Sequence, residues 1–256
     1  KRISTAEVIA GDGDDAVVIS SPESIAWLLN IRGGDVPRTP LPLSFAILNR
    51  KAAVDLYIDE RKLTRETRDH LGNAVTVRPR EALGPAIDIL VADGVALRVD
   101  PASSPSWIAR RIEAAGGTVS RGEDPVVLPR AMKNPIELSG TRAAHIRDGV
   151  AMTRFLHWFA AEAPGGKVDE IMAANRLRAF RAEGAHFKDL SFDTISGSGP
   201  NGAIVHYRVT EESNRVIQCG DLYLVDSGAQ YLDGTTDITR TIAVGDPGDE
   251  ARDRFT

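Results

Sequence analysis

Short apolar runs alternate with helix-like segments through residues 1–134, and this alternation constrains the fold more than any other feature of the sequence. Apolar and β-branched residues predict strands at 16–19, 44–48, 53–58, 74–77 and 95–99. Helices are expected at 60–71, 81–92 and 105–115, and Ser21 followed by Pro22 starts another that ends before Gly33-Gly34. Such alternation indicates a sheet covered by helices, which is an α/β arrangement.

A second domain is expected to begin close to Asn134. Asn134 can cap a helix whose first residue is Pro135, because a short polar side chain suits the cap and proline suits the first turn. Another helix is expected at 170–183, ahead of a β-rich segment. The sequence therefore predicts two domains, residues 1–134 and residues 135–256.

Composition excludes several classes of protein. The net charge of −5 gives no basic footprint, so no nucleic-acid partner is expected. No apolar run approaches the roughly 20 residues that span a bilayer, so no membrane association is expected either. Cys219 is the single cysteine, which rules out an internal disulfide and is typical of a reducing compartment such as the cytoplasm.

Two aspartates, Asp226 and Asp237, flank an expected hairpin within the stretch 222–241. Opposed residues of an antiparallel pair have a constant number sum, and alternate side chains share a face. The sum for these two residues is odd, as for a hairpin closed by an even number of loop residues, so both carboxylates are expected on one face. Such a pair can bind two divalent cations, which can activate a water for hydrolysis. The alternative is two solvated aspartates beside a turn, since Asp and Gly are ordinary turn residues.

The position of the turn decides the register between these two aspartates. A two-residue turn at Asp233-Gly234 would leave them about four residues out of register, whereas a longer reversal centred on Tyr231-Leu232 would set them directly opposite, roughly 5 Å apart. Only the second register suits a shared two-metal site, so the sequence predicts a wide loop or a bulge here.

A loop rich in glycine and serine at 196–202 leads into an apolar run at 203–207, which predicts a strand that carries His206. A histidine there could hydrogen-bond a substrate or shuttle a proton, because its unperturbed pKa lies near neutrality. A purely structural histidine is the alternative. The loop lacks the Lys and Ser/Thr that end a P-loop, and Ser198 does not sit in a Gly-x-Ser-x-Gly elbow.

Several long motifs, in order along the chain, resemble Xaa-Pro aminopeptidase (aminopeptidase P) in its larger three-domain form. In the second half they are Asp189-Leu190-Ser191-Phe192-Asp193-Thr194-Ile195-Ser196, the loop Gly199-Pro200-Asn201-Gly202, His206, Val225-Asp226-Ser227-Gly228-Ala229-Gln230-Tyr231 and Asp233-Gly234-Thr235-Thr236-Asp237-Ile238-Thr239-Arg240-Thr241. The segment from Glu23 to Val36 resembles the family's second domain, and the segment from Arg142 to Gly149 resembles the helix that opens its catalytic domain. The resemblance therefore extends over most of the chain.

The resemblance implies a creatinase-like α/β domain over residues 1–134, followed by the first part of a pita-bread catalytic domain over residues 135–256. In this family the aspartates that match Asp226 and Asp237 bind two divalent metals, usually manganese, and the one that matches Asp237 bridges both. The histidine that matches His206 contacts the substrate near the scissile bond. Hard oxygen ligands suit manganese without excluding zinc or cobalt.

The family's remaining ligands are one histidine and two glutamates, and the motifs that supply them are not among these 256 residues. We therefore expect the chain to be an internal portion of a longer enzyme, dimeric at full length, and we expect the 256-residue span alone to be inactive.

The expected activity is release of the N-terminal residue from peptides with proline at the second position, by a hydroxide activated on two metals. A prolidase that cleaves Xaa-Pro dipeptides is the nearest alternative. A metal-free hydrolase of the creatinase kind and a non-catalytic peptide- or histone-binding module are two others. Proteins of the last two kinds have the metal-binding aspartates replaced, so the presence of Asp226 and Asp237 favours the aminopeptidase.

Overall fold

The computed structural model describes residues 1–255, and the chain divides into two compact units, Lys1–Lys133 (unit 1) and the residues from Asn134 onward (unit 2). Unit 1 is built on one six-stranded sheet with the strand order β4-β3-β2-β1-β5-β6. Its strands are β1 (Ala16–Ile19), β2 (Phe45–Asn49), β3 (Val54–Tyr57), β4 (Val75–Arg78), β5 (Leu97–Val99) and β6 (Val119–Arg121). The sheet is mixed, because β1 pairs antiparallel with β2 and parallel with β5. The α/β prediction is confirmed.

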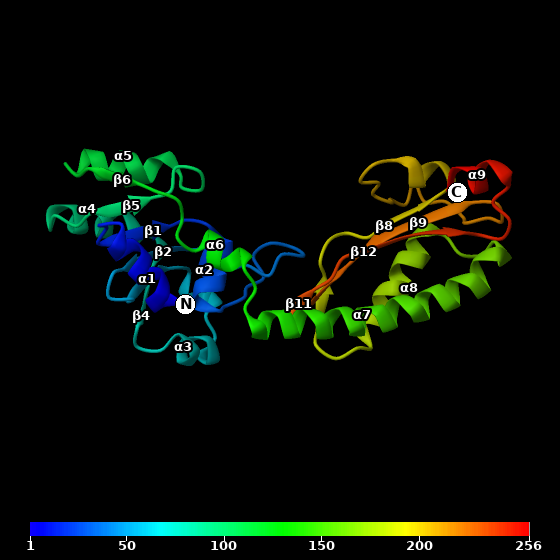
Figure 1. Ribbon diagram of the computed structural model, residues 1–256, viewed down its shortest axis with the longest axis horizontal. Helices are drawn as coiled ribbons and strands as arrows, with labels where there is room; N and C mark the ends of the chain where they lie inside the picture. Colours follow the sequence, from blue (N-terminus) through cyan, green and yellow to red (C-terminus); the bar gives the residue numbers. More distant parts are fainter. Residues whose placement is uncertain (256) are drawn as a thin grey trace. The chain divides into compact units, whose positions relative to one another are not determined.

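Helices cover both faces of this sheet (Figure 1). They are α1 (Arg2–Gly11), α2 (Pro22–Leu29), η1 (Glu60–Lys62), α3 (Arg65–Leu71), η2 (Arg80–Ala82), α4 (Leu83–Ala92), α5 (Ser106–Ala114) and α6 (Val127–Ala131). On the central strand β1, Val17 and Ile19 pack with α1 and α2, whereas Ala16 and Val18 pack with α4 and α5. Both faces are apolar because both are covered, which explains the continuous apolar run in the sequence.

The predicted helix over 60–71 is wrong as a single element, because two caps divide it. The side chain of Asp59 accepts a hydrogen bond from the N–H of Arg61 and starts η1. Thr64 then accepts one from the N–H of Thr67 and starts α3. Each cap satisfies a helix-end donor that would otherwise lack a partner.

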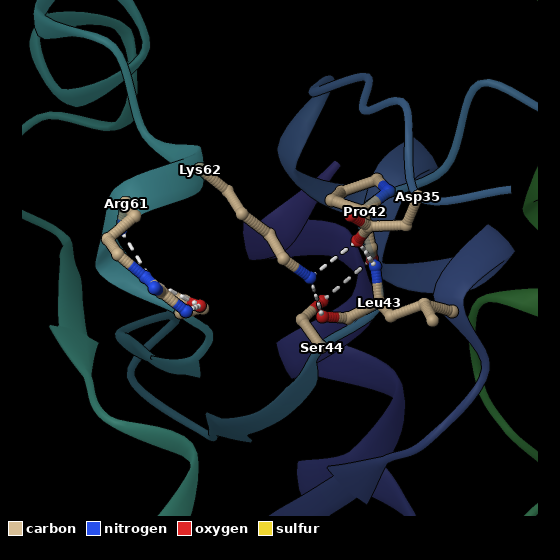
Figure 2. Close-up of polar contacts among 7 residues, drawn as sticks. Asp35, Pro42, Leu43, Ser44, Arg61 and Lys62 are labelled. Carbon is tan, nitrogen blue, oxygen red and sulfur yellow. Dashed lines mark hydrogen bonds and ion pairs between the residues drawn. The ribbon is translucent and has the colours of Figure 1, made fainter.

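An ion pair between partly exposed side chains ties the loop between α2 and β2 to η1, as Figure 2 shows. The ammonium group of Lys62 lies 2.6 Å from Asp35 Oδ2, and the same oxygen accepts a hydrogen bond from the N–H of Leu43 at 2.6 Å. The hydrogen bond from Lys62 and then the one from Leu43 lower the pKa of Asp35. Gly33 lies so close to Pro42 that a Cβ there would meet its backbone nitrogen at 2.7 Å.

Unit 2 begins with a 28-residue helix, α7 (Pro135–Glu162), whose start matches the predicted cap. Asn134 accepts a hydrogen bond from the N–H of Glu137, and the Glu137 carboxylate accepts one from the N–H of Asn134. This reciprocal capping box satisfies two donors at the helix end. The short η3 (Ala163–Gly165) and the helix α8 (Glu170–Ala182) follow.

Two three-stranded sheets complete unit 2, in the orders β11-β10-β7 and β12-β9-β8. The elements are β7 (Phe187–Leu190), β8 (Ile195–Ser198), η4 (Gly199–Ala203), β9 (Leu222–Ser227), β10 (Ala229–Tyr231), β11 (Gly234–Thr235), β12 (Ile238–Ala243) and α9 (Asp249–Phe255). Tyr223 and Val225 on β9 pack against aromatic residues of α7, and the rings of Phe159 and Tyr223 stack with centroids 4.5 Å apart. In Figure 1, α7 and α8 lie along one side of these strands. None of the helices described in residues 1–255 is long and apolar enough to cross a bilayer.

Candidate metal centre

Asp226 lies on the central strand of a three-stranded sheet, on the face turned away from α7 and α8. Burial alternates along β9, with Tyr223, Val225 and Ser227 buried toward the helices. Asp226 therefore points to the opposite face, between Ile195 on β8 and Thr239 on β12, which are its cross-strand neighbours. Because β9 pairs with a strand on each side, the backbone that carries the Asp226 carboxylate is held in place.

Asp237 lies on the same face, as the odd number sum predicts. It immediately precedes β12, in which Thr239 is opposite Asp226, so Asp237 is two residues along the ladder from that opposed position. Diagonal neighbours of this kind have Cα atoms roughly 7–8 Å apart, and carboxylate side chains can span that gap.

The predicted wide loop or bulge at the hairpin tip is wrong, and so is the directly opposed register. Gln230 pairs with Thr235 and Tyr231 pairs with Gly234, which leaves Leu232 and Asp233 as a two-residue turn. The same number sum continues into β9 and β12, so the reversal keeps one register from tip to base. The turn at Leu232-Asp233, one residue earlier than Asp233-Gly234, thus places Asp226 and Asp237 diagonally across the ladder.

The two carboxylates interact, and one of their oxygens has no partner within residues 1–255. Oδ1 of Asp226 is buried and accepts no hydrogen bond from any of these residues, which is costly for an acceptor unless a ligand satisfies it. Partial desolvation raises the pKa of Asp237, and the charge of Asp226 and a hydrogen bond with it raise that pKa further. A divalent cation would satisfy the orphaned oxygen and neutralise the repulsion, so the donor set fits a hard metal ion.

The pair alone is an incomplete metal site. Within residues 1–255, no group of three or more His, Cys, Asp or Glu side chains converges in a way that could hold a metal ion. Two monodentate or bridging carboxylates fill only part of the coordination that hard divalent cations require.

A buried ion pair supports the strand junction directly behind Asp226. Arg181 of α8 is fully buried and donates two hydrogen bonds to Asp148 of α7, at 2.7 and 3.0 Å. The same guanidinium donates to the hydroxyl and carbonyl oxygens of Ser227 and to the carbonyl of Gly228. The hydroxyl of Tyr231 also donates to Asp148 at 2.9 Å. These contacts join both helices to the chain on either side of the β9–β10 junction.

Neither Asp148 nor Arg181 was expected from the sequence to matter for the site. The sequence does give one indication of a buried ion pair, which is a charged residue on the apolar face of a helix. Such residues are almost never buried unless they are paired. That signal does not identify the partner, which is 33 residues away in the sequence.

Gly228 is required by close contact at this junction. A Cβ at this position would lie 2.0 Å from the carbonyl oxygen of Thr236 and 2.2 Å from Oγ of Ser191. The N–H of Thr236 in turn donates to the carbonyl of Ala229 at 2.9 Å. The chain next to Asp237, just before β12, therefore lies against a backbone position that only glycine can occupy.

His206 lies on a turn and not on a strand, so the predicted strand over 203–207 is wrong. The chain forms η4, and the N–H of Tyr207 then donates to the carbonyl of Ile204 at 3.1 Å. His206 is exposed and adopts a left-handed backbone conformation with φ of 54°. It makes no hydrogen bond or ion pair to Asp226 or Asp237 among the described residues.

The loop before His206 nevertheless packs on the strands of the site. A Cβ on Gly202 would lie 3.5 Å from the Cβ of Leu224, which is two residues from Asp226 on the same face of β9. The structure thus brings the two aspartates together and places the histidine-bearing segment against their strand.

Both units match known families. Residues 1–137 match the Creatinase/Prolidase N-terminal domain, and residues 139–256 match Metallopeptidase family M24. A curated protein named "Probable Xaa-Pro aminopeptidase P" from Paracoccidioides brasiliensis (strain Pb03) is 39% identical over 254 residues, which cover 93% of this chain and 41% of the relative. The chain thus spans about two fifths of the length of that relative.

Two solved structures share the fold of this chain. X-prolyl aminopeptidase from Caenorhabditis elegans, described as a cytosolic enzyme with a di-nuclear active site, has a TM-score of 0.87 and 31% identity over 97% of this chain and 42% of its own. Xaa-Pro dipeptidase from Bacillus anthracis has a TM-score of 0.76 and 22% identity over 98% of this chain and 67% of its own, a likeness of fold. By the match over residues 1–137, this chain belongs to the Creatinase/Prolidase N-terminal domain family, and its remaining part matches Metallopeptidase family M24.

Proposed function

We propose that the protein containing this chain is a metal-dependent aminopeptidase that releases the N-terminal residue from peptides with proline at the second position. The observation that supports a metal reaction is the buried, unpartnered Oδ1 of Asp226 beside the carboxylate of Asp237. The names of the Paracoccidioides and Caenorhabditis relatives support the substrate class.

Asp226 and Asp237 are the proposed ligands of two divalent cations, with manganese as the preferred metal and zinc or cobalt as alternatives. Two such cations, when bound, polarise a scissile carbonyl and lower the pKa of a water. One histidine and two glutamates from outside these 256 residues are proposed to complete the coordination. The span of 256 residues alone is therefore expected to bind manganese weakly and to show no turnover, and robust manganese-dependent cleavage by this span would contradict that.

The chain's own residues would orient the substrate. Asp226 is fixed by strands on both sides, so its carboxylate needs little reorganisation when a ligand binds. His206 is exposed on a turn, where its imidazole can hydrogen-bond a peptide close to the scissile bond. We assign His206 this contact with substrate as part of the proposal.

Product analysis with the full-length protein tests the activity and separates it from that of a prolidase. A tripeptide with proline second and a Xaa-Pro dipeptide are each incubated with the manganese-loaded protein. We expect release of the first residue from the tripeptide. Cleavage of the dipeptide alone would instead identify a prolidase. Asp226→Asn should lower the tripeptide rate by at least about 100-fold, while Glu211→Gln, which removes an exposed carboxylate of unit 2, should leave it unchanged.

We also propose a cytoplasmic location and a homodimer for the full-length protein. The exposed, single Cys219 supports a reducing compartment, and the Caenorhabditis relative is described as cytosolic. Light scattering of the full-length protein should give twice the mass of one chain, and a mass of one chain would contradict the dimer.

A further inference from the structure

Glu170, at the start of α8, carries a carboxylate that is completely buried and fully hydrogen-bonded. Oε1 accepts from the N–H of Ser198 at 2.7 Å and from Nδ2 of Asn201 at 3.0 Å. Oε2 accepts from the hydroxyl of Tyr207 at 3.0 Å and from the N–H of Arg215 at 3.2 Å. Nδ2 of Asn201 also lies 3.1 Å from Oε2. A buried carboxylate is costly unless such donors compensate it.

These donors come from the ends of one segment and from a second loop that lies beside it. Ser198 ends β8, Asn201 lies in η4, and Tyr207 closes the turn that follows. The hydroxyl of Tyr207 is shared with Ser213, whose hydroxyl lies 2.9 Å away. One carboxylate therefore fixes the segment 198–207 near both of its ends and ties it to the segment 213–215.

His206 lies inside the segment that Glu170 fixes, next to Tyr207. Tyr207 is buried, whereas Ile204, Val205 and His206 are exposed. A left-handed backbone at a non-glycine residue is unfavourable and persists only where surrounding contacts hold it. Backbone hydrogen bonds from Ile204 to Asn201 and from Tyr207 to Ile204 close this turn, and the contacts of Asn201 and Tyr207 to Glu170 anchor it to α8. The direction in which the His206 side chain projects thus depends on a carboxylate that makes no contact with it.

We propose that Glu170 is a positioning residue, which holds the turn 201–207 so that His206 is presented to the peptide substrate. The proposal deepens the proposed function and rests on it, because it takes His206 as the group that contacts substrate. It assigns no contact with substrate to Glu170 itself.

Glu170→Gln is the informative variant because it keeps the volume of the side chain. Its amide offers one acceptor oxygen in place of two, and its NH₂ group would face either Ser198 and Asn201 or Tyr207 and Arg215. The backbone N–H of Ser198 or that of Arg215 then loses its acceptor. Glu183→Gln is the matched control, since Glu183 lies at the other end of α8 and its side chain forms an exposed ion pair with Arg154.

The test is a double-mutant cycle on kcat/KM in the full-length, manganese-loaded protein. We expect Glu170→Gln to lower kcat/KM at least tenfold with an unchanged manganese content, and Glu183→Gln to change neither. We also expect the double variant Glu170→Gln/His206→Ala to be no slower than His206→Ala, because a residue that acts only through His206 has no effect once His206 is gone. An equal loss from Glu170→Gln in both backgrounds would overturn the proposal.

Hydrogen exchange of the same variants separates this proposal from the proposed function. Amides of the segment 199–207 should exchange at least tenfold faster in Glu170→Gln than in the wild type or in Glu183→Gln. If the full-length protein cleaves no proline-second peptide, the proposed function fails whatever the exchange rates are. Unchanged exchange in this segment overturns the positioning role even if the peptidase activity is present.

Discussion

Asp237 lies two residues along the β9–β12 ladder from the position opposite Asp226, and both carboxylates occupy one face of the sheet. Without a cation the two groups repel, and this raises the pKa of Asp237 together with its desolvation. A raised carboxyl pKa means that the folded protein binds the proton more tightly than the unfolded chain. This group therefore lowers the free energy of unfolding as pH rises above 3.8.

Asp237→Asn should consequently stabilise the metal-free, full-length protein at pH 7 and destabilise it when manganese is present. Because Asp237 is exposed, the metal-free gain should be small, up to about 2 °C in Tm. Thermal unfolding measured first with EDTA and then with excess manganese should show a higher Tm than the wild type in EDTA and a lower Tm in manganese. A variant that is less stable than the wild type under both conditions would show that the two carboxylates do not repel.

Gly228→Ala should disturb the register that brings these aspartates together. Its Cβ would overlap the carbonyl of Thr236, one residue before Asp237, so β12 must move. We expect a loss of about 1–3 kcal/mol in the free energy of unfolding and weaker manganese binding by calorimetry. Gly149→Ala on α7 is the matched control, because its Cβ would meet nothing within 4 Å. That control should be neutral or more stable by about 0.5–1 kcal/mol.

Arg181→Met should destabilise unit 2 strongly, because it leaves Asp148 charged, buried and without its cation. Removing one partner of such a pair costs about 3–5 kcal/mol. Arg208→Met removes an ion pair whose partners are largely exposed, Arg208 with Asp193, and should cost about 1 kcal/mol or less. Urea unfolding followed by circular dichroism compares the two variants. Equal losses would mean that the buried pair contributes no more than a surface pair.

Asp35→Asn should weaken unit 1 in a pH-dependent manner. Lys62 and the N–H of Leu43 lower the pKa of Asp35 below 3.8, so its stabilisation is present above the unfolded pKa and is lost as pH falls through the folded one. We expect a loss of about 1–2 kcal/mol at pH 7 that disappears once the pH falls below the lowered pKa of Asp35 in the folded protein. Asp69→Asn, in an exposed pair 3.9 Å from Arg65, should change nothing at either pH. If Asp35→Asn lowers the free energy of unfolding equally at all pH values, the loss comes from altered packing and not from the charge of Asp35.

The parts of the fold that could be predicted from the sequence are those set by residues close together in the chain. β1 was predicted from four consecutive apolar residues, and all four are buried between helices. The start of α7 was predicted from Asn134 and Pro135, and the capping box forms there. The shared face of the two aspartates followed from the parity of their numbers, because strand side chains alternate with a period of two.

The position of the hairpin turn could not be predicted from the sequence. The glycine of Asp233-Gly234 suggests a turn, but Gly234 is needed for a tertiary contact and not for the turn. A Cβ on Gly234 would lie 2.9 Å from the Cβ of Ala144 on α7, so Gly234 permits close helix approach. The turn itself uses Leu232 and Asp233, neither of which has a positive φ. The strand predicted around His206 is also absent because contacts with residues distant in the sequence decide the structure there. Its apolar residues Ile204 and Val205 are 53% and 82% exposed, and distant contacts to Glu170 shape that segment instead.

The metal content of the full-length protein, measured by elemental analysis after manganese loading and desalting, tests the assignment of Asp226 and Asp237 most directly. Two manganese ions per chain are expected in the wild type, and fewer than one in Asp226→Asn and in Asp237→Asn, with peptidase activity lost in parallel. Two ions per chain and undiminished turnover in either variant would contradict the assignment.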